Sequence, residues 1–414
     1  MPEETGKAQA VYPLQIRSQG DLAQVISHIG ADPRCNTYFQ PKRRTLAFYS
    51  PDVDYRAAAF LKQELLARGG DVVVARHVID GRTERSAVLL LGTEGQLLAL
   101  LKKAHSMDCW GLAALREALA EALEKSRLAT WRFSLPGGRE LVLDKDTKLM
   151  GILNLTPDSF YEESRLKDER ELLTRAELML SEGAAVLDVG AESTRPGIEP
   201  ISEEDEMRRL LGPLRALRRE FPDAILSVDT YKGKVALAAA DAGADIINDV
   251  GGFSLDAAML KSAVETGLPY VLSHIRGTPR IMKELPPYED LLSELNLYFQ
   301  EKLLQLEKAG LPRNRVILDP GLGFAKTARD NLLILKELES LTVLGCPLLI
   351  GHSRKRFTGS VTQTATPEER LQSVTAISAL LYGRAHILRV HDVAPNRQAL
   401  ATAKAVLESQ PWDS

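Results

Sequence analysis

Polar side chains follow a series of short apolar segments in the second half of the chain, and several of them can do chemistry. The carboxylates Asp229 and Asp319 and the amide Asn248 come at the ends of three such segments. A carboxylate suits an edge on which two N–H groups lie side by side, and an amide both donates and accepts hydrogen bonds. These groups therefore predict a site for a flat, nitrogen-rich heterocycle.

A second set of residues is cationic and follows the last two apolar segments. It consists of Lys355, Arg389 and His391. In barrels of parallel strands, phosphate is often bound beside the final strands, and backbone N–H groups of glycine-rich turns add contacts to an anion. Together the two sets predict a heterocycle that carries a phosphate or a diphosphate.

Asp188 is a further acidic residue, but it lies within an apolar segment and not at its end. Its carboxylate either forms a structural hydrogen bond with a neighbouring strand or belongs to the site, and the sequence leaves both open. Burying such groups without partners is costly. Eight apolar segments that all end in polar residues therefore favour a site at those ends.

The elements that must position these residues are strands that alternate with helices. The apolar segments occupy residues 149–155, 185–189, 224–228, 245–247, 269–272, 316–318, 347–350 and 387–390. Helical patterns cover residues 168–182, 203–220, 232–242, 290–309, 331–341 and 368–382. This alternation predicts βαβ units and a parallel sheet. Eight units in about 270 residues match a (β/α)8 TIM barrel, which usually has roughly 250; a doubly wound sheet is the alternative.

The first 130 residues have a different character and predict a small mixed α/β domain. Strand patterns lie at residues 45–49, 72–75 and 87–91, and helical patterns at 55–68, 94–105 and 112–125. No catalytic constellation is found there, so we expect residues 1–130 to be an accessory domain of unknown role. Residues 131–414 would form the barrel, preceded by a β-hairpin (131–135 and 140–143) that closes its bottom.

Charge and composition exclude several classes of protein. Lys and Arg number 52 against 56 Asp and Glu, which gives a net charge of −4 and argues against nucleic-acid binding through a broadly basic surface. One local cluster of arginines, interleaved with leucines, predicts a solvated helix face. Its members are Arg208, Arg209, Arg215, Arg218 and Arg219.

The three cysteines are far apart, which argues against a disulfide framework or a structural zinc site and fits a reducing compartment. The N-terminus lacks the apolar region of a signal peptide, and no run approaches 18 apolar residues. The expected location is cytoplasmic, with no membrane association.

Several motifs together resemble the dihydropteroate synthase family. They are MGILNLTPDSF at 150–160, ESTRPG at 192–197, SVDT at 227–230, INDV at 247–250, DPGLGF at 319–324, SRK at 353–355 and RVHDV at 389–393. They occur in the family's order over about residues 130–400, and the first and last are the most specific.

The resemblance implies a step of folate synthesis. The amine of 4-aminobenzoate displaces the diphosphate of 6-hydroxymethyl-7,8-dihydropterin diphosphate, and 7,8-dihydropteroate and pyrophosphate are formed. The family uses Mg²⁺ and is commonly dimeric, so a homodimer is expected. No protein nucleophile is required.

The resemblance also assigns roles to individual residues. Asp229, Asn248, Asp319 and Lys355 would hold the pterin, with Phe324 nearby, and Asp229, Asp319 and Lys355 would be catalytic. Arg389 and His391 would grip the diphosphate, and Asn154 would help bind Mg²⁺ with it. Thr194, Arg195, Pro196 and Ser353 would surround the 4-aminobenzoate.

One departure from the family pattern keeps two alternatives open. Residues 161–164 read YEES, where the family usually has Ser-Asp-Gly-Gly. A pterin-binding protein without catalytic activity is one alternative. The other is a pterin-dependent methyltransferase that passes a methyl group to a corrinoid, although that enzyme would need neither ESTRPG nor the Arg389 and His391 pair.

Overall fold

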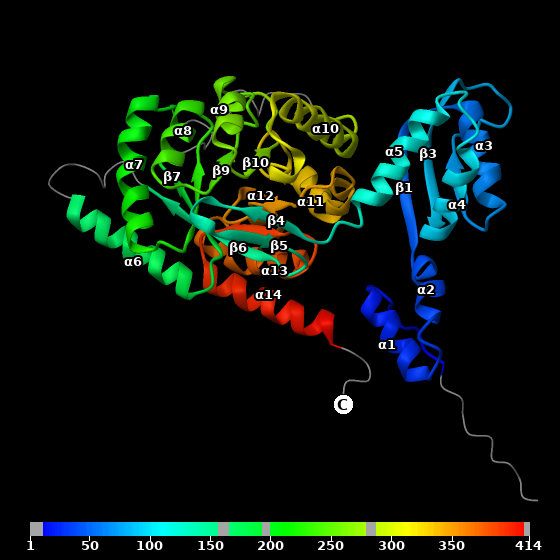
Figure 1. The fold of residues 1–414 in the computed structure, drawn as a ribbon, viewed down its shortest axis with the longest axis horizontal. Coiled ribbons are helices and arrows are strands. Elements are labelled where there is room, and N and C mark those ends of the chain that lie inside the picture. Colours follow the sequence, from blue (N-terminus) through cyan, green and yellow to red (C-terminus); the bar gives the residue numbers. More distant parts are fainter. Residues whose placement is uncertain (1–10, 156–164, 193–198, 279–286, 410–414) are drawn as a thin grey trace, which may run out of the picture. The chain divides into compact units, whose positions relative to one another are not determined.

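The computed structural model describes residues 11–155, 165–192, 199–278 and 287–409. The chain divides into two compact units, residues 1–123 with 409–414, and residues 124–408 (Figure 1). Each unit has its own hydrophobic core.

The first unit is a three-stranded antiparallel sheet with helices. In chain order its elements are α1 (Gln19–Ile29), α2 (Cys35–Phe39), β1 (Thr45–Asp54), α3 (Tyr55–Leu66), β2 (Asp71–Val74), β3 (Arg85–Thr93), α4 (Glu94–Ala104) and α5 (Leu112–Lys125). β3 lies between β1 and β2. Leu65, Leu90 and Leu97 are buried in its core. The mixed α/β character is confirmed, while α1 and α2 were not predicted.

The second unit is a barrel of eight parallel strands. They are β6 (Lys148–Asn154), β7 (Val186–Gly190), β8 (Ile225–Asp229), β9 (Ile246–Asp249), β10 (Tyr270–Ser273), β11 (Val316–Asp319), β12 (Leu349–Ile350) and β13 (Ile387–Val390). The sheet runs β11-β10-β9-β8-β7-β6-β13-β12. A parallel bridge between Leu318 and Leu348 joins its two ends. The predicted (β/α)8 barrel is confirmed, and each strand lies within two residues of its predicted start and end.

Helices cover the outside of the barrel (Figure 1). They are α6 (Arg165–Ser181), α7 (Glu203–Glu220), α8 (Gly233–Asp241), α9 (Ala258–Thr266), α10 (Leu291–Ala309), α11 (Ala328–Lys336), α12 (Arg356–Thr362), α13 (Leu371–Leu381) and α14 (Val393–Glu408). α7 shows why the bounds fall where they do. The Ser202 side chain accepts the N–H of Asp205 at its start, acidic residues fill the first turn, and basic residues fill the last. Each of these features favours the helix dipole or satisfies a free N–H group.

The prediction that the arginines of α7 form a solvated helix face is wrong for Arg218. Its guanidinium instead turns inward and donates to the buried carboxylate of Asp245 (2.5 Å) and to the Gly243 carbonyl oxygen (2.9 Å). Arg139 of the hairpin loop donates to the same carboxylate (2.7 Å). A fully buried carboxylate needs such partners, and the helical pattern could not reveal this one because Asp245 is distant in sequence.

A β-hairpin closes the amino-terminal end of the barrel. Its strands are β4 (Trp131–Ser134) and β5 (Glu140–Leu143), which pair antiparallel. Phe133 and Leu141 are buried in one cluster with residues that begin the barrel strands, such as Met150 and Ile246. The prediction that a hairpin closes the bottom of the barrel is confirmed.

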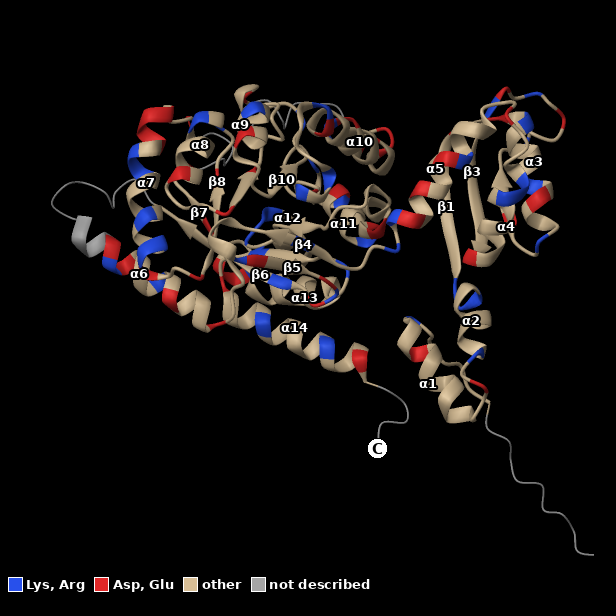
Figure 2. Ribbon diagram, in the orientation of Figure 1, with Lys and Arg blue, Asp and Glu red and all other residues tan. Residues whose placement is uncertain are grey.

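Charged residues of both signs are spread along the outer helices of the barrel (Figure 2). No helix in the described residues is long and apolar enough to cross a membrane.

Candidate active site

The interior of the barrel changes from apolar to polar along each strand. Met150, Val186 and Ile246 face inward at the bottom and pack with the hairpin, whereas their neighbours Leu149, Leu187 and Ile247 belong to the core under the helices. Because side chains alternate along a strand, the residues two positions further on also face inward. These include Ile152, Asp188, Asn248, Asp319 and Arg389. The site is therefore a polar upper layer above an apolar floor.

Four residues lie side by side across the carboxyl ends of neighbouring strands. Asn154 of β6 pairs in register with Gly190 of β7, Gly190 with Asp229 of β8, and Asp229 with Asn248 of β9. Gly190 has no side chain, and a Cβ built there would lie 3.3 Å from the Cβ of Asp229. The row therefore presents one carboxylate between two amides.

Arg389 reaches two carboxylates inside the barrel. Its Nε donates to Oδ2 of Asp188 (2.5 Å) and its Nη2 donates to Oδ2 of Asp229 (2.6 Å). Nδ2 of Asn248 donates to the same Asp188 oxygen (3.1 Å). Asp188 thus belongs to the site, and it links Arg389, predicted to hold the diphosphate, to Asn248, predicted to hold the pterin.

Asp319 ends β11 and is fixed by the turn that follows it. Its Oδ1 accepts the N–H of Gly321 (2.8 Å), and its carbonyl oxygen accepts the N–H of His274 (2.9 Å). Nζ of Lys326 donates to the carbonyl oxygens of Gly321 and Phe324, both at 3.1 Å, and lies 2.7 Å from Nδ1 of His274. These bonds stabilise the turn that orients the Asp319 carboxylate.

Lys355 lies on the other side of the same turn. Its ammonium donates to the Leu322 carbonyl oxygen and lies 5.1 Å from the centre of the Phe324 ring. A Cβ on Gly351 would lie 3.9 Å from both Oδ2 of Asp319 and Nζ of Lys355. The glycine therefore keeps a space between a carboxylate and an ammonium open to the barrel interior.

Ser353 and His391, predicted for two different substrates, contact one another. Oγ of Ser353 lies 2.9 Å from Nδ1 of His391 and accepts the His391 N–H (3.2 Å). Burial, together with Arg354 and Arg389 nearby, lowers the pKa of His391 to about 4. In the free chain His391 is therefore neutral at neutral pH, unlike the cation that the sequence suggested; an anion beside it would favour its protonated form.

Burial also shifts the acids and bases that would meet the heterocycle. It raises the pKa of Asp229 to about 7, with Arg389 opposing the rise and Asp188 adding to it. It raises the pKa of Asp319, against the effect of Lys355. It lowers the pKa of Lys355 to about 8, against the effect of Asp319. Although burial acts to lower it, the carboxylates of Asp188 and Asp229 raise the pKa of Arg389. Such a cluster of shifted groups is typical of functional sites.

Three buried polar atoms inside the barrel have no hydrogen-bond partner among the described residues. They are Oδ1 of Asp188, Oγ of Ser227 and Oγ of Ser273. Most buried polar atoms in proteins have a partner. Asp188 and Ser227 are paired in register on β7 and β8, so their orphaned atoms indicate a polar ligand or water.

The structure brings most of the predicted residues to one end of the barrel. Asn154 is exposed there at the end of β6. Thr194, Arg195 and Pro196 lie outside the described residues. The last described residue before them, Glu192, is held by ion pairing to Lys232, whose Nζ also donates to Glu206 (2.6 Å).

Sequence reasoning missed the part played by Lys326 and left Asp188 open. Lys326 is the second residue after DPGLGF, and its position after a strand end was the available signal. The pairing of Asp188 with Arg389 spans 201 residues of sequence. Only the closed barrel brings those two residues together.

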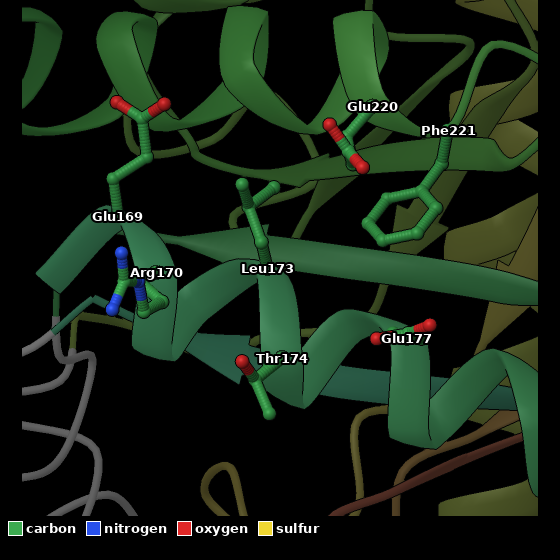
Figure 3. A pocket seen from close by; sticks show the side chains of 7 residues that line it. All are labelled: Glu169, Arg170, Leu173, Thr174, Glu177, Glu220 and Phe221. Atoms are coloured by element: carbon green, nitrogen blue, oxygen red, sulfur yellow. The ribbon is translucent and has the colours of Figure 1, made fainter. Parts of the chain in front are cut away.

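A cavity of about 250 Å³ lies elsewhere, between α6 and α7 (Figure 3). It is lined by Glu169, Arg170, Leu173, Thr174, Glu177, Glu220 and Phe221. None of these is a predicted site residue, and none follows the carboxyl end of a strand. The cavity therefore does not coincide with the polar interior of the barrel.

Comparison with known families agrees with this geometry. The family model described as "Pterin binding enzyme" matches residues 150–391, which is most of the barrel. The dihydropteroate synthase of Synechocystis sp. is 39% identical over 274 residues, which cover 66% of this chain and 94% of that protein. Every described residue predicted for the site lies within the matched range.

A solved structure and a longer relative extend the comparison. Dihydropteroate synthase from Xanthomonas albilineans in complex with 7,8-dihydropteroate is 34% identical with a TM-score of 0.59, and the match covers 67% of this chain and 99% of that one. A probable bifunctional folylpolyglutamate synthase/dihydropteroate synthase of Haloferax volcanii is 34% identical over 405 residues. That match covers 96% of this chain, so it includes the first unit, and 48% of the relative.

Proposed function

This chain belongs to the dihydropteroate synthase family of pterin-binding transferases, and on that premise we propose which residues carry out its reaction. The reaction condenses 6-hydroxymethyl-7,8-dihydropterin diphosphate with 4-aminobenzoate. One observation carries the assignment: two carboxylates, an amide and an ammonium from β8, β9, β11 and the start of α12 converge above the apolar floor of one barrel.

Asp229, Asn248, Asp319 and Lys355 bind the pterin in this proposal. The carboxylates accept N–H groups of the ring, and the Asn248 amide can both accept and donate. Phe324, next to Lys355, offers an apolar face to a flat ring. The orphaned atoms of the barrel interior support a polar ligand at this depth.

Arg389, His391 and Asn154 bind the diphosphate end. Arg389 supplies a guanidinium and His391 supplies ring nitrogens at the end of β13, while Asn154 is exposed at the end of β6. No group of three His, Cys, Asp or Glu side chains among the described residues could hold a metal. Mg²⁺ often takes only one or two protein oxygens beside phosphate and water. The amide oxygen of Asn154 fits that role, and the ion would neutralise charge on the leaving diphosphate.

Thr194, Arg195, Pro196 and Ser353 are proposed to surround 4-aminobenzoate. Of these the structure describes Ser353, which is buried and bonded to His391. This contact supports a 4-aminobenzoate site beside the diphosphate. The attacking amine would then face the carbon that the diphosphate leaves.

The chain's own residues stabilise charge as the bond to the diphosphate breaks. The C–O bond between the pterin methylene and the diphosphate breaks with its electron pair on oxygen, and positive charge develops on the methylene carbon. The fixed carboxylates of Asp229 and Asp319 stabilise that charge. The amine nitrogen then forms the C–N bond and loses a proton, so no residue of the chain becomes covalently attached.

The first unit is proposed to be accessory, because every described site residue lies in residues 124–408. A homodimer is proposed on the family resemblance. Size-exclusion chromatography with light scattering would test the dimer.

Pyrophosphate release tests the function directly. We expect release from the pterin diphosphate that depends on 4-aminobenzoate and Mg²⁺, and loss of that release in Asp319→Asn with folding retained. Tight binding of the pterin diphosphate without release would favour a non-catalytic binder. Transfer of a methyl group to a corrinoid protein would favour the methyltransferase.

A further inference from the structure

Asp188 is a buried carboxylate that two other site residues share. Its side chain is fully buried in the middle of β7. One of its oxygens accepts from Nε of Arg389 (2.5 Å) and from Nδ2 of Asn248 (3.1 Å), while the other has no partner among the described residues. A charge in this position interacts strongly with its neighbours, because no water screens it.

Arg389 also hydrogen-bonds to Asp229, the carboxylate that is proposed to bind the pterin. Nη2 of Arg389 lies 2.6 Å from Oδ2 of Asp229. A ring N–H group that takes the acceptor position on which Nη2 lies displaces Nη2 from this oxygen. The guanidinium would then be a buried charge without a partner, which is strongly unfavourable, unless another carboxylate holds it.

We propose that Asp188 is a positioning residue that retains Arg389 when the pterin takes Asp229, so that Arg389 is freed on one side for the diphosphate. Pterin binding and diphosphate binding are then coupled through one guanidinium. The inference rests on the proposed function and adds to it a residue that acts through Arg389 and Asn248.

The geometry allows Arg389 to leave Asp229 while it keeps its hydrogen bond to Asp188. Arg389 uses Nε for Asp188 and Nη2 for Asp229, so the two hydrogen bonds can break separately. Asp188 also holds the Asn248 amide by its nitrogen. The Asn248 oxygen is thereby directed to accept a hydrogen bond from a ligand.

The test compares two ligands on Asp188→Asn, which keeps the shape of the side chain and removes its charge. Affinities for 6-hydroxymethylpterin and for its diphosphate are measured by titration calorimetry. We expect the affinity for 6-hydroxymethylpterin to fall by about tenfold or more, the scale of one lost charged hydrogen bond. The diphosphate ligand should lose much less, because its own anion replaces the missing counter-charge.

A pH profile gives a second readout that a purely structural residue would not move. The Asp188 carboxylate contributes to the raised pKa of Asp229. Affinity for the pterin should fall at acid pH as Asp229 is protonated. In Asp188→Asn this fall should therefore occur at lower pH. Other charged groups that act on Asp229, among them Arg389, Glu206, Asp249 and Lys355, are unchanged in this variant.

Arg389→Met provides the matched background. Without the guanidinium, Asp188→Asn should cause no further loss of affinity for 6-hydroxymethylpterin, and thermal unfolding would confirm that both variants fold. If Asp188→Asn does not fold, the wild-type chain still tests the proposal. Pyrophosphate should then tighten the binding of 6-hydroxymethylpterin to the wild-type chain. Absence of that coupling overturns the proposal.

Equal losses for both ligands, an unmoved pH limb or the same loss in the Arg389→Met background would each overturn the proposal. So would a wild-type chain that binds no pterin. A chain that binds both ligands with these differences but releases no pyrophosphate would contradict the proposed function and leave the role of Asp188 supported.

Discussion

Gly321 lies directly against the backbone of His274: a Cβ on Gly321 would come within 2.0 Å of the His274 carbonyl oxygen. Its backbone also has a φ of 66°, which residues with side chains seldom adopt. The Gly321 N–H is the group that fixes Oδ1 of Asp319. The close approach of these two loops therefore sets the direction of the Asp319 carboxylate.

Gly321→Ala should lower both stability and activity. The clash and the unfavourable φ together should cost about 2–4 kcal/mol of unfolding free energy. Displacement of the turn should also reduce kcat/KM for the pterin diphosphate. Urea unfolding and pyrophosphate release would measure the two effects, and a fully active, equally stable variant would contradict the assigned role of this contact.

Gly351→Ala is the matched control. Its Cβ would lie 3.9 Å from Asp319 Oδ2 and Lys355 Nζ, which is ordinary contact distance. We expect nearly unchanged stability and weaker pterin binding, because the methyl group enters the space between two proposed pterin ligands.

The activity should depend on pH through Asp229 and Lys355. Burial raises the pKa of Asp229 to about 7, and the ionised form is needed to accept ring N–H groups, so kcat/KM should fall as the pH drops below about 7. Burial lowers the pKa of Lys355 to about 8, so the ammonium should be lost, and kcat/KM should fall again, above about 8. A profile of kcat/KM for the pterin diphosphate would show both limbs.

Lys355→Arg separates the two limbs. A guanidinium stays charged throughout this range, so the alkaline limb should disappear while the acid limb remains. An alkaline limb that persists would belong to another group and would remove Lys355 from this part of the prediction.

Most of the fold could be predicted because its signals are local. Each barrel strand is a short apolar run that ends in polar residues, and the α7 bounds follow from Ser202 and the charges in its end turns. α1 was missed although its signals are local: Leu22, Val25, Ile26 and Ile29 recur at helical spacing, and Ser18 and Asp21 form a capping box at its start. Arg218 was misplaced because its partner Asp245 becomes a neighbour only when β9 lies beside β8.

The site was predictable as a set of residues but not as a network. Strand ends and family motifs pointed to Asp229, Asn248 and Asp319. That Arg389 occupies Asp229 in the free chain depends on which side chains face inward and on the closure of the barrel. The neutral state of His391 depends on burial, which its sequence neighbours do not show.

Lys232→Met should destabilise the second unit. The Lys232 side chain is 9% exposed and pairs with Glu192 and Glu206, which are 7% and 1% exposed. Leaving two buried carboxylates without their cation should cost about 3–5 kcal/mol. Urea unfolding would measure the loss.

The loss in Lys232→Met should also shrink as the pH falls. Burial already raises the pKa of Glu206, with Lys232 opposing, and removal of Lys232 raises it further. A group whose pKa is higher in the folded than in the unfolded state penalises folding most when it is ionised. Lys232→Met combined with Glu206→Gln should recover part of the loss, and no recovery would show that the charges are not the cause.

Removal of residues 1–123 should leave a folded barrel that releases pyrophosphate at an unchanged rate. All described site residues lie in residues 124–408, which have their own core. Circular dichroism and the pyrophosphate assay would test this. A folded but inactive barrel would show that the first unit contributes to the chemistry and is not accessory.

Phe133→Ala should destabilise the barrel without changing its affinity for the pterin. Phe133 is fully buried in the cluster that joins the hairpin to the strand beginnings, at the end of the barrel opposite the site. Loss of a buried phenylalanine typically costs about 3–5 kcal/mol. Arg132→Ala, on the exposed face of the same strand, should change stability by less than about 0.5 kcal/mol. Equal effects of the two substitutions on stability would mean that the hairpin does not close the barrel through this side chain. A large loss of pterin affinity in Phe133→Ala would mean that the apolar floor and the polar layer above it are not independent.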